Sequence, residues 1–274
     1  MDPLSPRNAR VQAVRRLARQ NRHRADRRAF VVEGPTLVVD AIEAGLHVEA
    51  VFHTDGAPGG CLDRARAAGI EVVAVQDAAM EAMATTVTPQ PVVAVTQMPE
   101  PPPLTETLAG SGHVVVLDRV QDPGNAGTIL RSAEASGSLA VVFGWGSVDV
   151  HNPKVVRASA GAVFRVAVYH DRDLGTAKAL DILTQLGRRA YATAADAPVA
   201  YDEVDLADAV IVMGNEAGGI AVEDLPMLDG VIGIPQEGGG ESLNVAMAAT
   251  ILCFEAARQR RAASGLHGDS APRR

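Results

Sequence analysis

Six short apolar runs between positions 113 and 234 constrain the fold of this chain more than any other feature. Most of them are continuous rather than alternating with polar residues, which is typical of strands buried on both faces of a parallel sheet. Helical stretches separate them, as in an α/β fold. The expected strands are His113–Leu117, Ala140–Phe143, Phe164–Val168, Arg189–Thr193, Ala209–Met213 and Val231–Ile234, and the expected helices are Gly127–Ser136, Leu174–Leu186 and Glu241–Arg261.

A smaller α/β unit precedes this region, with a helix after Pro35 and strands expected at Ala29–Glu33, Val48–Phe52, Glu71–Val75 and Val92–Thr96. Four prolines between positions 99 and 103 then interrupt the pattern, because proline cannot donate to a β-ladder and favours an extended chain. The sequence therefore predicts an N-terminal domain over residues 1–98, a proline-rich linker over 99–104, a larger domain over 105–262 and a disordered tail over 263–274.

Charge is divided unevenly along the chain. The first 30 residues carry nine arginines against two aspartates, a net charge of +7, whereas the other 244 residues carry −15. Val11, Val14 and Leu17 fall on one helical face, which predicts a basic amphipathic helix. The planar fork of arginine suits phosphate recognition, and a solvated helix face is the alternative. Candidates for contact with nucleic acid are Arg15, Arg16, Arg19, Arg22, Arg24, Arg27 and Arg28.

Composition argues against several other classes of protein. No apolar run approaches the ~20 residues that cross a bilayer, and the arginine-rich N-terminus lacks the apolar core of a secretory signal. Cys61 and Cys253 lie far apart and flank no His/Cys cluster, so buried free thiols are expected, with no metal site. Aromatic residues are few, so base stacking is not expected to dominate nucleic-acid binding. These features predict a cytoplasmic protein without a membrane partner.

Three strand-to-loop junctions carry the polar residues of interest, and the first runs from Leu117 to Arg131. It contains the segment Asp122-Pro123-Gly124-Asn125, for which turn formation alone is a sufficient explanation. Asn125, however, is expected near the partially positive N-terminus of a helix. Arg131 follows six residues later, so both side chains are expected to point toward one anion.

The other two junctions also follow apolar runs. Gly214-Asn215-Glu216 continues beyond Met213, where glycine permits close backbone approach to a ligand at the carboxyl end of a strand. A plain turn is the alternative. Ser242 and Asn244 lead into the last long helix, with Ser242 either its N-cap or part of a site. Asn244 is expected in the first turn, where asparagine is a poor helix former, which indicates a side chain needed for another purpose.

Together the three junctions resemble motifs 1, 2 and 3 of the SpoU (TrmH) family of RNA ribose 2'-O-methyltransferases, over residues 113–258. The segment Asn152–Ala162 resembles the connection between the family's motifs 1 and 2. Residues 7–97 resemble the family's substrate-binding domain, which is similar to ribosomal L30e. The resemblance implies a SPOUT fold, in which a parallel sheet with a deep trefoil knot holds S-adenosylmethionine. It also implies a homodimer with active sites at the interface.

The resemblance further implies a role for individual residues. Gln236 departs from the family pattern, where methionine is common, and Ala246 stands where a small hydroxyl often occurs. Arg131 joins the candidates for RNA binding, because a guanidinium pKa above ~12 favours a phosphate clamp over a general base. The implied catalytic residues are Asn125, Arg131, Glu216, Ser242 and Asn244. The implied cofactor-binding residues are Met213, Gly214, Asn215, Glu216, Gly219, Ile234, Gln236, Ser242, Leu243 and Asn244.

The expected function is S-adenosylmethionine-dependent, metal-free methylation of a ribose 2'-hydroxyl in structured RNA. The separate N-terminal domain and the basic arm favour 23S rRNA over tRNA. Two further alternatives stay open: an RNA-binding protein that keeps the fold without catalysis, and a nucleotide-dependent α/β enzyme acting on a small molecule. The target nucleotide, and the choice between a housekeeping and an antibiotic-resistance role, are not fixed by the sequence.

Overall fold

The computed structural model of the protein describes residues 2–170, 176–215, 227–238 and 242–265. The chain forms two compact units, each with its own sheet and hydrophobic core. The first unit contains residues 1–100 and 149–165, and the second contains residues 101–148 and 166–274. None of the described helices is both long and apolar enough to cross a membrane.

The sheet of the first unit has four strands in the order β1-β4-β2-β3. β4 runs antiparallel to β1 and β2, whereas β3 is parallel to β2. All four strands predicted in this region are confirmed, with ends that differ by at most one residue. The strands are β1 (Ala29–Glu33), β2 (Val48–His53), β3 (Glu71–Ala74) and β4 (Val92–Gln97), and the helices are α1 (Ala9–Arg19), α2 (Asn21–Arg27), α3 (Pro35–Glu43), α4 (Gly59–Ala67), α5 (Asp77–Met83), α8 (Pro153–Ala158) and the 3-10 turn η1 (Ala162–Phe164).

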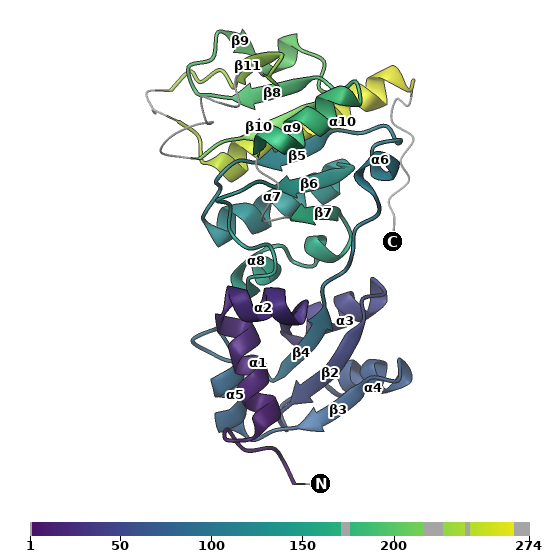
Figure 1. The fold of residues 1–274 in the computed structure, drawn as a ribbon, viewed down its shortest axis with the longest axis vertical. Coiled ribbons are helices and arrows are strands. Elements are labelled where there is room, and N and C mark those ends of the chain that lie inside the picture. The colour runs from purple at the N-terminus through teal and green to yellow at the C-terminus, as the bar shows by residue number, and fades with distance from the viewer. Residues whose placement is uncertain (1, 171–175, 216–226, 239–241, 266–274) are drawn as a thin grey trace. The chain divides into compact units, whose positions relative to one another are not determined.

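Helices cover this sheet because successive strand residues point to opposite faces. Val31 and Phe52 face a core that also contains residues of α1 and α5. α1 contributes Val11, Val14 and Leu17, the apolar face predicted from their helical spacing. α3 and α4 pack against each other, and both lie apart from α1 and α5 in Figure 1.

Residues 149–165 follow a strand of the second unit in the chain but pack in the first unit. Asp149 forms an ion pair with Arg24 at 2.6 Å, and the two side chains are only 7% and 4% exposed. The ring of Phe164 lies 6.4 Å from that of Phe30, measured between centroids. This interval is therefore part of the core that positions α2 and β1.

The sheet of the second unit has seven strands among the described residues, in the order β7-β6-β5-β10-β8-β11-β9. Every pairing is parallel, which confirms the fold class expected from the continuous apolar runs. The strands are β5 (Val114–Leu117), β6 (Ala140–Phe143), β7 (Ala167–His170), β8 (Ala190–Thr193), β9 (Val199–Ala200), β10 (Val210–Met213) and β11 (Gly230–Gly233), and the helices are α6 (Leu104–Thr107), α7 (Pro123–Ser136), α9 (Thr176–Gln185), α10 (Val245–Ala263) and the 3-10 turn η2 (Tyr201–Glu203).

Both faces of this sheet are covered. On one face, Val114 and Val116 of β5 share a core with Leu180 and Leu183 of α9. The intervening Val115 is also fully buried, and α7 and α10, which pack against each other, contact β6 and β10. Two-sided burial explains why these strands lack polar alternation. The two cysteines are buried free thiols, as expected.

Four local features differ from the prediction. Helix α7, expected at Gly127–Ser136, begins four residues earlier at Pro123, directly after its N-cap Asp122. The strand expected at 164–168 begins at Ala167, because Gly161 (φ +84°) leads into the turn η1. The two-residue strand β9 has no apolar run long enough to predict it. The last helix begins at Val245 rather than Glu241. Of the expected tail, residues 266–274 lie outside the described part of the chain.

Candidate active site

The carboxyl ends of β8, β10 and β11 surround a cavity of about 460 Å³. Ligands of open α/β sheets bind at this edge, and the volume lies in the usual range for small-molecule sites. Its apolar lining residues are Met213, Ile232, Ile234, Leu243, Val245 and Leu252, and its polar lining residues are Thr193, Asp196, Asn215, Gln236, Ser242 and Asn244.

Eight of the ten residues expected to bind a cofactor line this cavity, namely Met213, Gly214, Asn215, Ile234, Gln236, Ser242, Leu243 and Asn244. The other two, Glu216 and Gly219, lie outside the described residues. The wall formed by residues 193–196 was not predicted from the sequence. That segment contains no motif, and its only signal is its position directly after a predicted strand.

A hydrogen bond from Asn244 links the third strand-to-loop junction to the first. Asn244 Oδ1 accepts hydrogen bonds from the backbone N–H groups of Ala246 at 2.9 Å and Met247 at 3.3 Å, so Asn244 is the N-cap of α10. Its Nδ2 donates to Oδ1 of Asn125 at 3.0 Å, across 119 positions of sequence. The alternative that Ser242 caps this helix is wrong, and Ser242 lines the cavity instead.

Helix α7 carries both Asn125 and Arg131. Asp122 caps the helix by accepting the Asn125 N–H at 2.8 Å. Six residues of α-helix correspond to about 600°, so the two side chains leave the axis about 120° apart. The expectation that both point toward one anion therefore stays a prediction, and it depends on the long Arg131 side chain leaning toward the N-terminus of α7. Arg131 is exposed and has no ion pair within the described residues.

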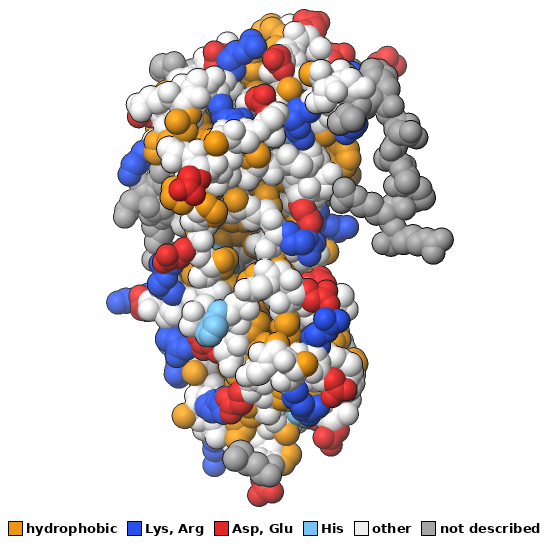
Figure 2. All heavy atoms as spheres, turned by 90° about the vertical axis from the view of Figure 1, so that its right-hand side faces the viewer, with side chains coloured by type: hydrophobic (Ala, Val, Ile, Leu, Met, Phe, Trp, Pro, Cys, Tyr) orange, Lys and Arg blue, Asp and Glu red, His pale blue; other side chains and the backbone are white. Residues whose placement is uncertain are grey.

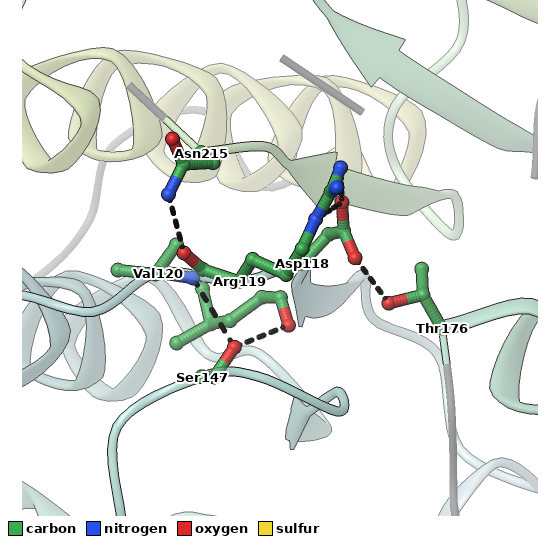
Figure 3. A network of polar contacts seen from close by, with 7 residues as sticks. Asp118, Arg119, Val120, Ser147, Thr176 and Asn215 are labelled. Atoms are coloured by element: carbon green, nitrogen blue, oxygen red, sulfur yellow. Dashed lines mark hydrogen bonds and ion pairs between the residues drawn. The ribbon is translucent and has the colours of Figure 1, made fainter. Parts of the chain in front are cut away.

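A buried carboxylate organises the loop after β5 (Figure 3). Asp118 Oδ1 accepts a hydrogen bond from Thr176 Oγ1 at 2.6 Å, and its Oδ2 accepts from Nε and Nη2 of Arg119 at 3.1 and 2.9 Å. Asn215 Nδ2 donates to the Arg119 carbonyl at 2.9 Å. The loops of the first and second junctions are thus tied together at the ends of the neighbouring strands β5 and β10.

The chemistry of the cavity suits a nucleoside carrying a cationic group. Met213, Ile232 and Leu252 provide an apolar surface for a flat ring, while the hydroxyl of Ser242 supplies a polar partner. Asp196 adds a carboxylate at the rim, which favours positive charge on a ligand. In the described part of the chain, no group of three His, Cys, Asp or Glu side chains is placed to hold a metal ion.

The candidate RNA contacts of the first unit fall into three groups. Arg24 is buried, and its guanidinium is held by Asp149, which removes it from the surface. Three are exposed but lie beside acids at 3.8, 3.2 and 2.9 Å: Arg22, Arg27 and Arg28. The last three are exposed on α1 and have no acidic partner within the described residues: Arg15, Arg16 and Arg19.

One face of the molecule is drawn in Figure 2, and its cationic side chains alternate with acidic ones. Among the atoms described on this face, no continuous basic patch forms. Because the overall charge of the protein is −8, a contact to an RNA backbone is better served by a local group of unpaired arginines.

The sequence profile of the SpoU rRNA Methylase family matches residues 112–254, more than half of the chain. The chain belongs to the SpoU rRNA methylase family. A second profile, the MRM3-like substrate binding domain, matches residues 8–94. The predicted family is confirmed, and the two profile matches follow each other along the chain.

Several similar proteins match this chain over nearly its whole length. The 23S rRNA (guanosine(2553)-2'-O)-methyltransferase RlmP of Bacillus subtilis is 33% identical over 251 residues, 91% of this chain and 96% of that protein. AviRb of Streptomyces viridochromogenes, solved with AdoMet, has a TM-score of 0.84 and 27% identity, covering 93% of this chain and 98% of its own. The AdoMet-bound rRNA methyltransferase of Sinorhizobium meliloti has a TM-score of 0.78 and 30% identity, covering 92% and 95%.

Proposed function

We propose that this protein transfers a methyl group from S-adenosylmethionine to a ribose 2'-hydroxyl of 23S rRNA. The observation that carries the proposal is the hydrogen bond between Asn125 and Asn244, which places the amides of two motifs together where Asn244 lines the cavity. RlmP, which matches nearly the full length of this chain, is a 23S rRNA 2'-O-methyltransferase, and this supports the substrate.

The side chains of the site position the reacting hydroxyl. When bound, S-adenosylmethionine supplies a methyl group carried on a sulfonium. Asn125, Ser242 and Asn244 orient the 2'-hydroxyl for in-line attack, and such orientation provides a large share of the rate enhancement in two-substrate reactions. Glu216 is proposed to organise the same site by its place in motif 2, although it lies outside the described residues.

Arg131 is proposed to clamp the phosphate next to the target ribose. It is exposed on α7, and guanidinium stays charged, so it binds phosphate better than it accepts a proton. Replacing Arg131 by lysine keeps the charge but removes the bidentate fork. We expect Arg131→Lys to lower turnover and RNA affinity, whereas wild-type values for both would exclude the clamp.

A homodimer belongs to the same proposal. α10 carries an apolar stripe of Met247 (63% exposed), Ile251 and Phe254 (45% exposed), which begins three residues after Asn244. Residues three and four apart lie on one helical face, so the stripe forms a continuous surface suited to a second copy. Light scattering of a Phe254→Glu variant tests it, with a monomer expected. A trefoil knot around the cavity and a cytoplasmic location, where the rRNA substrate would be met, complete the proposal.

Transfer of labelled methyl groups to separate 23S rRNA, 16S rRNA and tRNA tests the proposed function. We expect label in 23S rRNA, at one position that resists alkaline cleavage, and none with Asn125→Ala. Label confined to tRNA would replace the substrate but keep the chemistry. A folded protein that binds S-adenosylmethionine without transferring label to any of these RNAs would contradict the proposal.

A further inference from the structure

Trp145 is the only tryptophan of the chain, and 69% of it is exposed. It lies just beyond β6, whose last residue, Phe143, is fully buried. Exposed aromatic side chains beside a nucleic-acid site commonly stack on unpaired bases.

The indole is carried by a tight turn over residues 144–147. The Ser147 N–H donates to the Gly144 carbonyl at 3.1 Å and closes the turn. Gly146 has φ +83°, the left-handed value that the third position of a type II turn requires. A Cβ on Gly144 would lie 2.6 Å from Thr176 Oγ1, so a side chain does not fit there. Trp145 is thus presented between two glycines that the backbone requires.

This turn is bonded to the loop of the first junction (Figure 3). Ser147 Oγ donates to the Leu117 carbonyl at 2.9 Å and accepts the Val120 N–H at 3.2 Å. The Gly144 N–H donates to the same Leu117 carbonyl at 2.9 Å, and the Val148 N–H donates to the Val120 carbonyl at 2.9 Å. The backbone that leads to Asn125 therefore fixes the turn from which the indole projects.

The sheet order places Trp145 and the cavity on opposite sides of this loop. β6 and β10 flank β5, and neighbouring strands are ~4.8 Å apart, so the turn after β6 lies about 10 Å along the edge from the end of β10. Asn215, after β10, lines the cavity. An RNA strand whose ribose reaches Asn125 would pass within reach of Trp145 as it continues along this edge.

We propose that Trp145 stacks on an unpaired nucleobase next to the methylated nucleotide and holds the strand in register. The proposal rests on the proposed function, because it requires an RNA strand at this edge. The indole is a positioning residue, since it lies away from the cavity that would hold the methyl donor. The indole has a large flat face that can stack on any base, so it would select an unpaired neighbour rather than one particular base.

Fluorescence of the wild-type protein tests stacking directly, because Trp145 is its only tryptophan. The probes are a short oligoadenylate and an abasic oligomer with the same ribose-phosphate backbone. We expect quenching by the oligoadenylate and little change with the abasic oligomer. Absence of quenching by oligoadenylate, or equal quenching by both probes, would overturn the proposal.

Matched variants separate stacking from a structural role. Trp145→Leu keeps apolar volume without a ring, and Trp145→Phe keeps a smaller ring. The control Leu186→Ala removes an exposed apolar side chain that precedes the amino end of β8, whereas Trp145 follows the carboxyl end of β6. With a 23S rRNA transcript, we expect Trp145→Leu to raise the RNA KM about ten-fold, with kcat and the S-adenosylmethionine KM unchanged. Trp145→Phe should recover most of the loss, and Leu186→Ala should match the wild type.

The outcomes distinguish this proposal from the proposed function. A wild-type RNA KM for Trp145→Leu, beside normal methyl transfer, would overturn stacking and leave the function intact. A changed oligomeric mass in this variant would assign the indole to a subunit contact and also overturn it. If the wild-type protein transfers no methyl group, the proposed function fails, and the two fluorescence titrations still decide whether the indole stacks.

Discussion

Asn244 Nδ2 donates to Asn125 Oδ1 at 3.0 Å, and this bond fixes the orientation of both amides. The Oδ1 of Asn244 is already occupied by the N–H groups of Ala246 and Met247, so its Nδ2 must face Asn125. Asn125 in turn presents its Oδ1 to Asn244, which directs its own Nδ2 elsewhere. Asn244 therefore caps α10 and also determines which atom of the Asn125 amide faces it.

Asn244→Asp separates these two roles, because aspartate caps a helix about as well as asparagine but cannot donate from this position. We expect an unchanged urea midpoint and a loss of turnover of about 100-fold or more. Asn244→Ala should lose the cap as well, at about 1 kcal/mol of unfolding free energy. Single-turnover methyl transfer and urea denaturation measure the two effects. Wild-type turnover in Asn244→Asp would show that the donor has no catalytic role.

The buried pair of Arg24 and Asp149 should stabilise the first unit through their mutual neutralisation. Arg24 also donates to the Leu17 carbonyl at 2.8 Å, so it joins α1 and α2 to the segment that begins at Asp149. Arg24→Met leaves the Asp149 carboxylate unpaired and should cost about 3–5 kcal/mol in urea denaturation. The double variant Arg24→Met/Asp149→Leu should recover much of this, whereas Arg22→Met, at an exposed pair, should change stability by less than about 0.5 kcal/mol. Equal effects at positions 22 and 24 would contradict this account.

His113 makes stability depend on pH. Burial, with the nearby Arg260 cation, lowers the pKa of His113 to about 3, and its Nδ1 lies 2.9 Å from Arg260 Nη1. In the unfolded chain the imidazole binds a proton near its ordinary pKa of ~6.5. Between these two values the unfolded state holds more protons, so unfolding free energy should fall by up to ~1.4 kcal/mol for each pH unit below that ordinary pKa.

His113→Asn provides the control for this pH effect, since its amide oxygen can still accept from Arg260 but does not titrate. Its unfolding free energy should be lower than that of the wild type at neutral pH, and the difference should shrink as the pH falls from 6.5 toward 3. Denaturation curves at several pH values measure this difference. Parallel pH profiles for the two proteins would exclude His113 as the source.

The three unpaired arginines of α1 predict a specific salt dependence. Each phosphate contact contributes about 0.7–0.9 to the slope of log affinity against log salt concentration. Removing three such contacts should lower the slope by about 2–3 and weaken RNA binding without changing affinity for S-adenosylmethionine. The test variant is Arg15→Gln/Arg16→Gln/Arg19→Gln. The control removes equal charge at surface ion pairs, in Arg10→Gln/Arg64→Gln/Arg66→Gln, and an equal change of slope would contradict a local contact.

Local patterns were sufficient to predict most of the fold. Strands buried on both faces need apolar residues throughout, so continuous runs located six of the seven strands described in the parallel sheet, with only β7 displaced by more than one residue. β9 pairs through only two residues and leaves no comparable pattern. The cavity lining was predicted from the resemblance of the three strand-to-loop junctions, taken together, to the motifs of the SpoU family. Junctions that follow strands of one parallel sheet meet at one edge, which is where the cavity lies.

Long-range contacts were not predictable in the same way. The sequence places Arg24 in a basic helix, and nothing near it indicates that Asp149, 125 positions later, buries and neutralises it. The meeting of Asn125 and Asn244 likewise depends on how α10 packs against α7. The Trp145 turn shows the same limit, because its position depends on hydrogen bonds to the loop after β5. Each relationship is a property of packing between distant elements.

Asp196 provides a last test of the cavity, because it contributes a carboxylate to a lining that is otherwise apolar or neutral in the described part of the chain. S-adenosylmethionine carries a sulfonium cation that S-adenosylhomocysteine lacks, so the carboxylate should favour the former. Asp196 is exposed, which limits the expected loss in Asp196→Asn to about three- to five-fold in Kd for S-adenosylmethionine. Calorimetry with both compounds should show a smaller loss for S-adenosylhomocysteine, and Asp63→Asn should change neither. Equal losses for the two compounds would indicate that Asp196 contacts the nucleoside rather than attracting the charge.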